Sequence, residues 1–115
     1  MTLKIYHNPR CSKSRQTLEI IKSKTKEFKI IKYLVNPLTF KEIKLLLKNL
    51  KIEPIQLVRV QESIWKEKFK NKKMDNDEII YAIVNNPILM ERPIATKDNK
   101  AIIGRPPENV LILFS

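Results

Sequence analysis

The chain has 115 residues, of which 43% are hydrophobic and 30% charged, and this balance is typical of one folded domain rather than a disordered segment. No apolar stretch approaches the ~20 residues that cross a bilayer, and a single cysteine with a single histidine excludes an internal disulfide and a Cys/His metal cluster. The formal net charge of +11 comes from 23 basic and 12 acidic residues. Partners of opposite charge would be nucleic acid, an anionic membrane or a small anion.

Lysine supplies most of the positive charge, scattered along the chain with a denser run from Lys66 to Lys73. Nucleic-acid surfaces usually add arginine and stacking aromatic side chains. We therefore interpret the lysines as solvated surface and expect neither a nucleic-acid nor a membrane partner. Arginine is rare here, and its flat, bidentate fork matches an oxyanion. The candidate anion ligands are the five arginines, Arg10, Arg15, Arg59, Arg92 and Arg105.

The first third of the chain predicts a strand, a loop, a helix and a second strand. Residues 2–6 alternate apolar and polar, residues 7–10 break that pattern, and a helix fits from about Ser12. Residues 28–34 form the second strand, which Asn36-Pro37 ends. Such a unit favours parallel strands joined by a right-handed crossover. The start lacks the long apolar block of a secretion signal, and a free cysteine suits a reducing compartment, so we expect a cytoplasmic protein.

Helices dominate the middle of the chain. Thr39 and Glu42 form a capping box before an apolar pattern at i, i+3, i+4 and i+7, and Asp75 with Glu78 caps another helix that ends near Pro87. Shorter helical pieces cover residues 54–60 and 62–70. We interpret the aromatic residues of the second piece, Trp65 and Phe69, as core of this helical segment.

The last quarter of the chain predicts a β-hairpin and a final helix. Residues 93–96 and 101–103 flank a polar turn at 97–100, and Pro106-Pro107-Glu108 opens the helix. The resulting order, β-α-β, helical insert, β-β-α, indicates the α/β class with a thioredoxin-like (glutaredoxin-like) mixed sheet. We expect one domain over residues 1–115, with a helical insertion at about 39–86.

Cys11 stands where the first strand turns into the first helix, in the sequence His7-Asn8-Pro9-Arg10-Cys11-Ser12-Lys13-Ser14-Arg15. Unpaired backbone N–H groups and the helix dipole make that position favourable for anions and for a thiolate. Arg10, Lys13 and Arg15 add positive charge. The segment predicts a nucleophilic thiolate inside an oxyanion pocket, with Arg10 and Arg15 as binding residues. The alternative is a small, buried, unreactive cysteine.

Two related chemistries do not fit this cysteine. A low-molecular-weight phosphatase loop needs arginine six residues after its cysteine, where this chain has Thr17, and a dithiol site needs a second cysteine where it has Ser14. A covalent adduct on Cys11 must therefore be released by an outside thiol.

Ser14 and His7 are further candidate site residues. The Ser14 hydroxyl can donate to the Cys11 sulfur or serve as an ordinary first-turn hydroxyl. His7 either bonds the loop structurally or acts as a base that tunes Cys11.

The pattern His7-Asn8-Pro9-x-Cys11-x-x-Ser14-Arg15-x-Thr17-Leu18 resembles the signature of the glutaredoxin-coupled arsenate reductase (ArsC) family. Two later segments, Pro87-Ile88-Leu89-x-x-Arg92-Pro93-Ile94 and Gly104-Arg105-Pro106-Pro107-Glu108-x-Val110-Leu111, resemble that family's other motifs in order and spacing. The resemblance implies that Cys11 attacks arsenate. It also implies that three arginines bind the anion, Arg59, Arg92 and Arg105, and that the bond before Pro93 is cis.

The same resemblance implies the partners. Glutathione attacks the Cys11 adduct as co-substrate, glutaredoxin takes up the glutathione, and arsenite is released. No bound cofactor or metal is implied, because the electrons arrive as thiols.

Two other functions remain open from the sequence. One is a related glutathione-dependent thiol oxidoreductase that acts on another oxyanion or on a mixed disulfide. The other is a non-catalytic RNA-polymerase-binding regulator of similar sequence, although such regulators usually carry a Cys-x-x-Cys pair that Ser14 interrupts.

Overall fold

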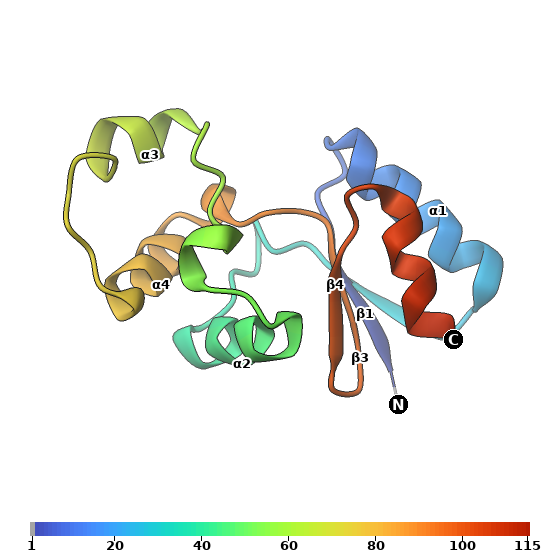
Figure 1. Ribbon diagram of the computed structural model, residues 1–115. Coiled ribbons are helices and arrows are strands. Elements are labelled where there is room, and N and C mark those ends of the chain that lie inside the picture. Colours follow the sequence, from blue (N-terminus) through green and yellow to red (C-terminus); the bar gives the residue numbers. More distant parts are fainter. Residues whose placement is uncertain (1) are drawn as a thin grey trace. The chain divides into compact units, whose positions relative to one another are not determined.

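The computed structural model describes residues 2–115 and divides into two compact units. One unit, here called the sheet unit, joins the chain up to Asn36 with Arg92–Ser115. The other, the helical unit, is Pro37–Glu91. Within residues 2–115, no helix has the length and apolar character required to cross a bilayer. The two units together hold all the elements drawn in Figure 1.

The sheet unit is a four-stranded mixed sheet with one α-helix and one 3₁₀ helix. Its elements are β1 (Leu3–Tyr6), α1 (Ser12–Lys24), β2 (Phe28–Ile31), β3 (Ile94–Lys97), β4 (Lys100–Ile103) and η3 (Pro107–Phe114). The strand order is β2-β1-β3-β4, with β1 parallel to β2 and β3 antiparallel to both β1 and β4. This arrangement confirms the predicted α/β class, the mixed sheet and the parallel first pair.

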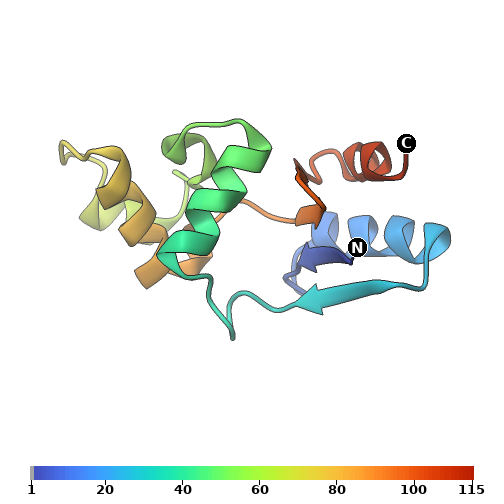
Figure 2. The same cartoon turned by 90° about the horizontal axis from the view of Figure 1, so that it is seen from below.

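The core of the sheet unit lies between one face of the sheet and the helices α1 and η3. These two helices lie side by side, as Figures 1 and 2 show. Alternation along β1 directs Leu3 and Ile5 to this face, where both are buried. The helices contribute Leu18, Ile21, Val110 and Leu113 to the same cluster. This packing holds the first turn of α1, and with it Cys11, at the end of β1.

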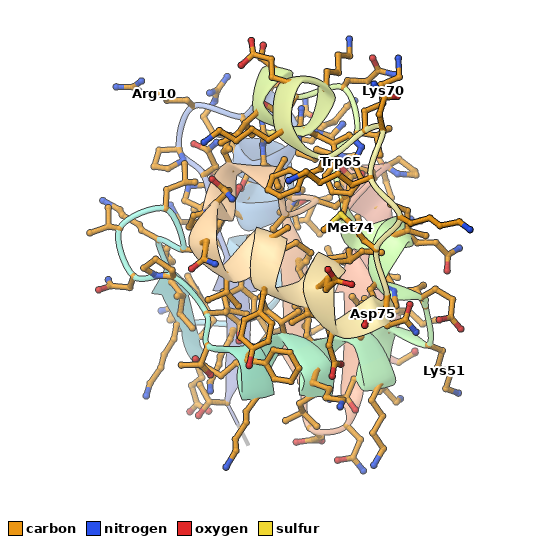
Figure 3. The ribbon with its side chains drawn as sticks, turned by 90° about the vertical axis from the view of Figure 1, so that its left-hand side faces the viewer. Arg10, Lys51, Trp65, Lys70, Met74 and Asp75 are labelled. Carbon is orange, nitrogen blue, oxygen red and sulfur yellow. The ribbon has the colours of Figure 1, made fainter. Side chains whose placement is uncertain are left out.

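The helical unit contains α2 (Phe40–Leu50), η1 (Pro54–Leu57), α3 (Ser63–Lys68), α4 (Asn76–Asn85) and η2 (Pro87–Leu89). Both predicted capping boxes are present: Thr39 and Asp75 each accept the N3 backbone N–H, and Glu42 and Glu78 accept the N-cap N–H in return. Trp65 is buried on α3 (Figure 3), and its ring centroid lies 5.5 Å from that of Phe69. Trp65 thus belongs to the core, as its pattern predicted.

The differences from the sequence prediction include two element ends and one helix type. β2 ends at Ile31 instead of residue 34, because the Lys32 carbonyl accepts the N–H groups of Val35 and Asn36 in a turn. The helical piece predicted at 54–60 shortens to the 3₁₀ helix η1, and Val58 pairs instead with Met90 in an antiparallel bridge. The last helix is 3₁₀ rather than α. The predicted insertion at 39–86 falls within the helical unit; a single domain over 1–115 stays a prediction.

Candidate active site

Cys11 is the N-cap residue of α1, with extended backbone angles before the helix begins. Its own N–H donates to the Asn8 carbonyl at 3.0 Å, and its carbonyl accepts the Arg15 N–H at 3.0 Å. These two bonds fix the backbone on both sides of the sulfur. Only 9% of the residue is exposed, so the thiol is largely shielded from solvent.

Several groups compete to set the pKa of Cys11. Burial raises that pKa, because it disfavours the thiolate. The opposing effects come from the Ser14 backbone N–H, a hydrogen bond and the positive charge of the Arg92 side chain, and the Lys13 backbone N–H. Together they outweigh burial and lower the pKa of Cys11 below its ordinary value. The first turn of α1 and one arginine therefore favour the thiolate, as the sequence argument expects.

Arg92 and Arg105 both reach the Cys11 sulfur from the segments that enter and leave the β3–β4 hairpin. Arg92 precedes β3 and Arg105 follows β4. The Arg105 Nη2 donates to Cys11 Sγ at 3.6 Å, while its Nε donates to the Arg92 carbonyl at 2.7 Å. The hairpin thus places two guanidinium groups beside one thiol, and Arg105 also ties the two arginines together. Such a cationic pair beside a nucleophile binds and polarises an oxyanion.

The single glycine of the chain makes the close approach of this hairpin to α1 possible. A Cβ at Gly104 would lie 2.6 Å from Thr17 Oγ1 and 2.8 Å from Pro93 Cγ. The Gly104 N–H donates to the Pro93 carbonyl at 2.9 Å, and Thr17 is fully buried. The Arg92–Pro93 bond is cis, as the resemblance implies, and Arg105–Pro106 is cis as well. Gly104 therefore sets the spacing between the nucleophile's helix and the arginines.

His7 and Ser14 are buried and bonded to each other under the Cys11 loop. His7 Nδ1 and Ser14 Oγ lie 2.6 Å apart, and Ser14 Oγ also accepts the Asn8 N–H at 3.0 Å. Burial, followed by the charges of Lys32, Lys22 and Arg15, lowers the pKa of His7. A neutral ring can accept the Ser14 hydroxyl proton at Nδ1. The Ser14 hydroxyl therefore organises the loop, and Ser14 acts on Cys11 through its backbone N–H.

The other three arginines predicted as anion ligands do not contact the Cys11 sulfur in the described contacts. Arg15 donates from Nη1 to the Pro9 carbonyl at 2.9 Å, so its side chain holds the loop. Arg10 is exposed and its side chain extends outward from the loop (Figure 3), while its backbone N–H donates to Asn8 Oδ1. Arg59 belongs to the helical unit, where its Nε pairs with Glu62 Oε2 at 3.2 Å. Within the sheet unit, the side chains of Arg92 and Arg105 are those that reach the sulfur.

Two residues of this site, Thr17 and Gly104, carry no role that the sequence pattern predicts. Thr17 donates to the Lys13 carbonyl at 2.8 Å and packs against Gly104. A signal for Gly104 existed, since it is the one glycine in 115 residues and directly precedes a candidate arginine. Thr17 carries no such signal outside the motif, because its importance depends on contacts across the fold.

The structure brings the Cys11 thiol and two guanidinium groups, those of Arg92 and Arg105, together at one place. No group of three or more His, Cys, Asp or Glu residues within 2–115 is arranged to hold a metal ion. The side chains that meet at the sulfur can support thiolate attack on an electron-poor centre whose charged oxygens the guanidinium groups hold.

Comparison with known proteins gives consistent matches over nearly the whole chain. The model of the ArsC family matches residues 6–113. An uncharacterized protein of Escherichia coli K12 is 44% identical over 111 residues, covering 95% of this chain and 93% of that protein. An arsenate reductase of Neisseria meningitidis serogroup A is 38% identical over 110 residues, covering 94% of each. The structure of an arsenate reductase from Vibrio cholerae superposes with a TM-score of 0.92 at 37% identity and covers 97% of each chain. These matches confirm the resemblance and the thioredoxin-like fold predicted from the sequence.

Proposed function

The chain belongs to the ArsC family, and on that premise we propose that it is an arsenate reductase that uses Cys11 as nucleophile and thiols as reductant. The observation that carries this proposal is the shared contact of Arg92 and Arg105 with the Cys11 sulfur. An arsenate oxygen held by these guanidinium groups brings the arsenic atom next to the thiolate.

The reaction begins with attack of the Cys11 thiolate on arsenic(V). A sulfur–arsenic bond forms and one oxygen leaves as water after protonation, which gives a Cys-thioarsenate. Glutathione then attacks the arsenic of that adduct and displaces a second oxygen as water. The glutaredoxin thiolate attacks the glutathione sulfur, which forms a disulfide and leaves the electron pair on arsenic, now arsenic(III). Water finally displaces the Cys11 thiolate from arsenic, and arsenite is released. Overall, arsenic gains two electrons, two thiols lose them by forming one disulfide, and one oxygen departs as water. Thiols supply all the electrons in this scheme, so no bound cofactor takes part.

The arginines and the helix terminus have distinct roles in this scheme. Arg92 and Arg105 hold the charged oxygens and disperse the negative charge that builds up in the transition state. The Ser14 and Lys13 backbone N–H groups keep Cys11 ionised before attack and accept it as a leaving thiolate afterwards. Arg59 is the third proposed oxyanion ligand, by the family resemblance alone.

Arsenate-dependent oxidation of NADPH tests the proposal directly. The assay contains the protein, glutathione, glutaredoxin and glutathione reductase, and oxidation is followed with and without arsenate. We expect turnover that needs arsenate, glutathione and glutaredoxin together, and its loss in Cys11→Ser. Absence of arsenate-dependent oxidation in wild-type protein whose Cys11 alkylates normally would reject arsenate as the substrate.

A further inference from the structure

Asn8 forms three hydrogen bonds around the nucleophile, through its carboxamide, its carbonyl and its N–H. Its Oδ1 accepts the Arg10 N–H at 3.0 Å, its carbonyl accepts the Cys11 N–H at 3.0 Å, and its N–H donates to Ser14 Oγ at 3.0 Å. Only 6% of Asn8 is exposed, whereas asparagine is mostly a surface residue. The three bonds reach the chain before, at and after Cys11, so Asn8 holds this segment as a whole.

Two of these bonds form a double turn that ends at Cys11. The bond from Asn8 Oδ1 to the N–H two residues later is an Asx turn, and the bond from its carbonyl to the N–H three residues later closes a β-turn. Pro9 occupies the second position of that β-turn, where its fixed φ suits the geometry. Cys11 follows with extended backbone angles as the N-cap residue of α1. The double turn therefore sets the direction from which the sulfur meets the helix terminus.

The position of the sulfur decides which groups act on it. The Ser14 and Lys13 N–H groups lie in the first turn of α1, and together with Arg92 they lower the pKa of Cys11. These effects depend on position, because a hydrogen bond weakens steeply as its geometry degrades. On the basis of the proposed function, we infer that Asn8 is a positioning residue, whose neutral carboxamide holds the turn that directs the Cys11 sulfur toward the α1 N-terminus and the arginine pair.

The neutrality of the carboxamide matters as much as its hydrogen bond. Aspartate forms the same Asx turn through a carboxylate oxygen. The Nδ2 group of Asn8 has no hydrogen-bond partner in the part of the chain that the structure describes, so a carboxylate at residue 8 would break no bond between protein groups. It would add a negative charge three residues before the nucleophile, which disfavours a second negative charge on the sulfur. Asparagine therefore provides the turn without the charge.

Two substitutions separate the hydrogen bond from the charge. Asn8→Ala removes the Oδ1 acceptor, whereas Asn8→Asp keeps an acceptor and adds the charge. In both variants we expect the pH midpoint of Cys11 alkylation by iodoacetamide to rise, by about half a pH unit or more for Asn8→Asp. The rise in Asn8→Asp should shrink at ~1 M salt, where charges interact only within about 3 Å. The rise in Asn8→Ala should persist at that salt concentration, because it comes from a displaced sulfur.

Rescue and turnover distinguish positioning from a merely structural role. Asn8→Ser restores a side-chain oxygen that can accept the N–H two residues later, so its alkylation midpoint should return toward that of the wild type. In Asn8→Ala we expect kcat for arsenate to fall about tenfold or more with a smaller change in KM, because Arg92 and Arg105 still bind the anion. All rates are corrected for the folded fraction, measured by urea denaturation.

Asn49 provides the matched control, because it is a half-buried asparagine on α2 of the helical unit. Asn49→Asp and Asn49→Ala should leave the Cys11 midpoint and kcat unchanged. A lower melting temperature in Asn8→Ala with wild-type midpoint and kcat would overturn the positioning role. If Asn8→Ala does not fold, the midpoints of Asn8→Ser and Asn8→Asp decide.

The charge argument has its own decisive outcome. A wild-type midpoint in Asn8→Asp at low salt would overturn the requirement for a neutral side chain at residue 8. The alkylation measurements contain no arsenate, so their outcome is distinguishable from a failure of the turnover assay.

Discussion

At Cys11, burial and hydrogen bonding act on the same thiol in opposite directions. Burial raises its pKa, whereas the Ser14 N–H, Arg92 and the Lys13 N–H lower it, and the lowering prevails. The outcome depends on charge and dipole placed within hydrogen-bonding distance, since more distant surface charges are screened by salt. A cysteine that is 9% exposed would otherwise behave as an inert apolar side chain.

The acidity of Cys11 is measurable by alkylation with iodoacetamide as a function of pH. Only the thiolate reacts, so the rate rises as pH passes through the pKa and then levels off. We expect the midpoint to lie below the ~8.5 of a free thiol. Arg92→Gln should move the midpoint upward, because it removes a hydrogen bond and a positive charge. A wild-type midpoint at or above ~8.5 would contradict the mechanism.

Arginine geometry is tested separately from arginine charge by substitution with lysine. Arg92→Lys and Arg105→Lys keep the charge but lose the planar fork, and Arg105→Lys also loses the Nε bond to the Arg92 carbonyl. We expect each to lower kcat/KM for arsenate at least about tenfold, or ~1.4 kcal/mol of transition-state stabilisation. Lys73→Arg, an exposed position on the helical unit, is the control. Near-wild-type kinetics in both arginine variants would show that the two residues are structural.

At the scale of elements, the site depends on how closely the β3–β4 hairpin packs on α1. Gly104 lies at that contact, between Thr17 of α1 and Pro93 before β3. Thr17 is β-branched and fully buried, so it has little freedom to move aside. Any side chain at residue 104 must therefore push the hairpin and its arginines away from Cys11.

Gly104→Ala is expected to reduce both stability and activity. Overpacking of a tight contact typically costs 1–3 kcal/mol, and we expect urea denaturation to show a loss of about that size. Because the displaced segment carries Arg105, kcat/KM should fall further than the folded fraction accounts for. Gly104→Ala with unchanged stability would show that the hairpin adjusts without strain. Double substitution with Thr17→Ser, which removes the Thr17 Cγ2 methyl that lies 3.1 Å from the added Cβ, should recover part of the loss.

Elements whose signals are local were predictable from the sequence, and those that depend on distant contacts were not. The capping boxes at Thr39 and Asp75 satisfy helix N-termini with residues three positions away, and both formed as expected. β2 ends at a turn in which the Lys32 carbonyl accepts the Val35 and Asn36 N–H groups and Tyr33 is fully buried. The shortening of the helical piece after residue 54 depends on Val58 pairing with Met90. Neither contact has a signature in its own segment.

The same division applies to the site. Cys11 at a helix N-terminus follows from local sequence, and the α1 N-cap position confirms it. The meeting of Arg92 and Arg105 at the sulfur requires the hairpin to fold back onto α1, which the family resemblance implied and residue spacing could not. The outward direction of Arg10 and the bond from Arg15 to Pro9 are likewise results of the loop conformation.

The net charge of +11 of the whole molecule can favour binding of a small oxyanion or of nucleic acid. The arginine pair is compact and lies at one sulfur, which matches a small tetrahedral anion. The lysines are dispersed, and a row of aromatic side chains for stacking bases does not accompany them among the described residues. Charge without stacking or base contacts gives non-specific nucleic-acid binding, which physiological salt weakens.

Anion binding by the intact protein therefore provides the last prediction. Arsenate, sulfate or phosphate should raise the melting temperature relative to chloride at equal ionic strength, because an anion that binds the folded state stabilises it by mass action. At ten times its Kd the stabilisation is about 1.4 kcal/mol, or roughly 4 °C or more for a chain of this size. Cys11→Ser should keep most of this response, since Arg92 and Arg105 remain, and Arg92→Lys with Arg105→Lys should lose it.

Duplex DNA or RNA at ~150 mM salt should bind no tighter than ~10⁻⁶ M. Tight, salt-resistant nucleic-acid binding without stabilisation by oxyanions would reverse this assignment and favour the polymerase-binding regulator over the enzyme.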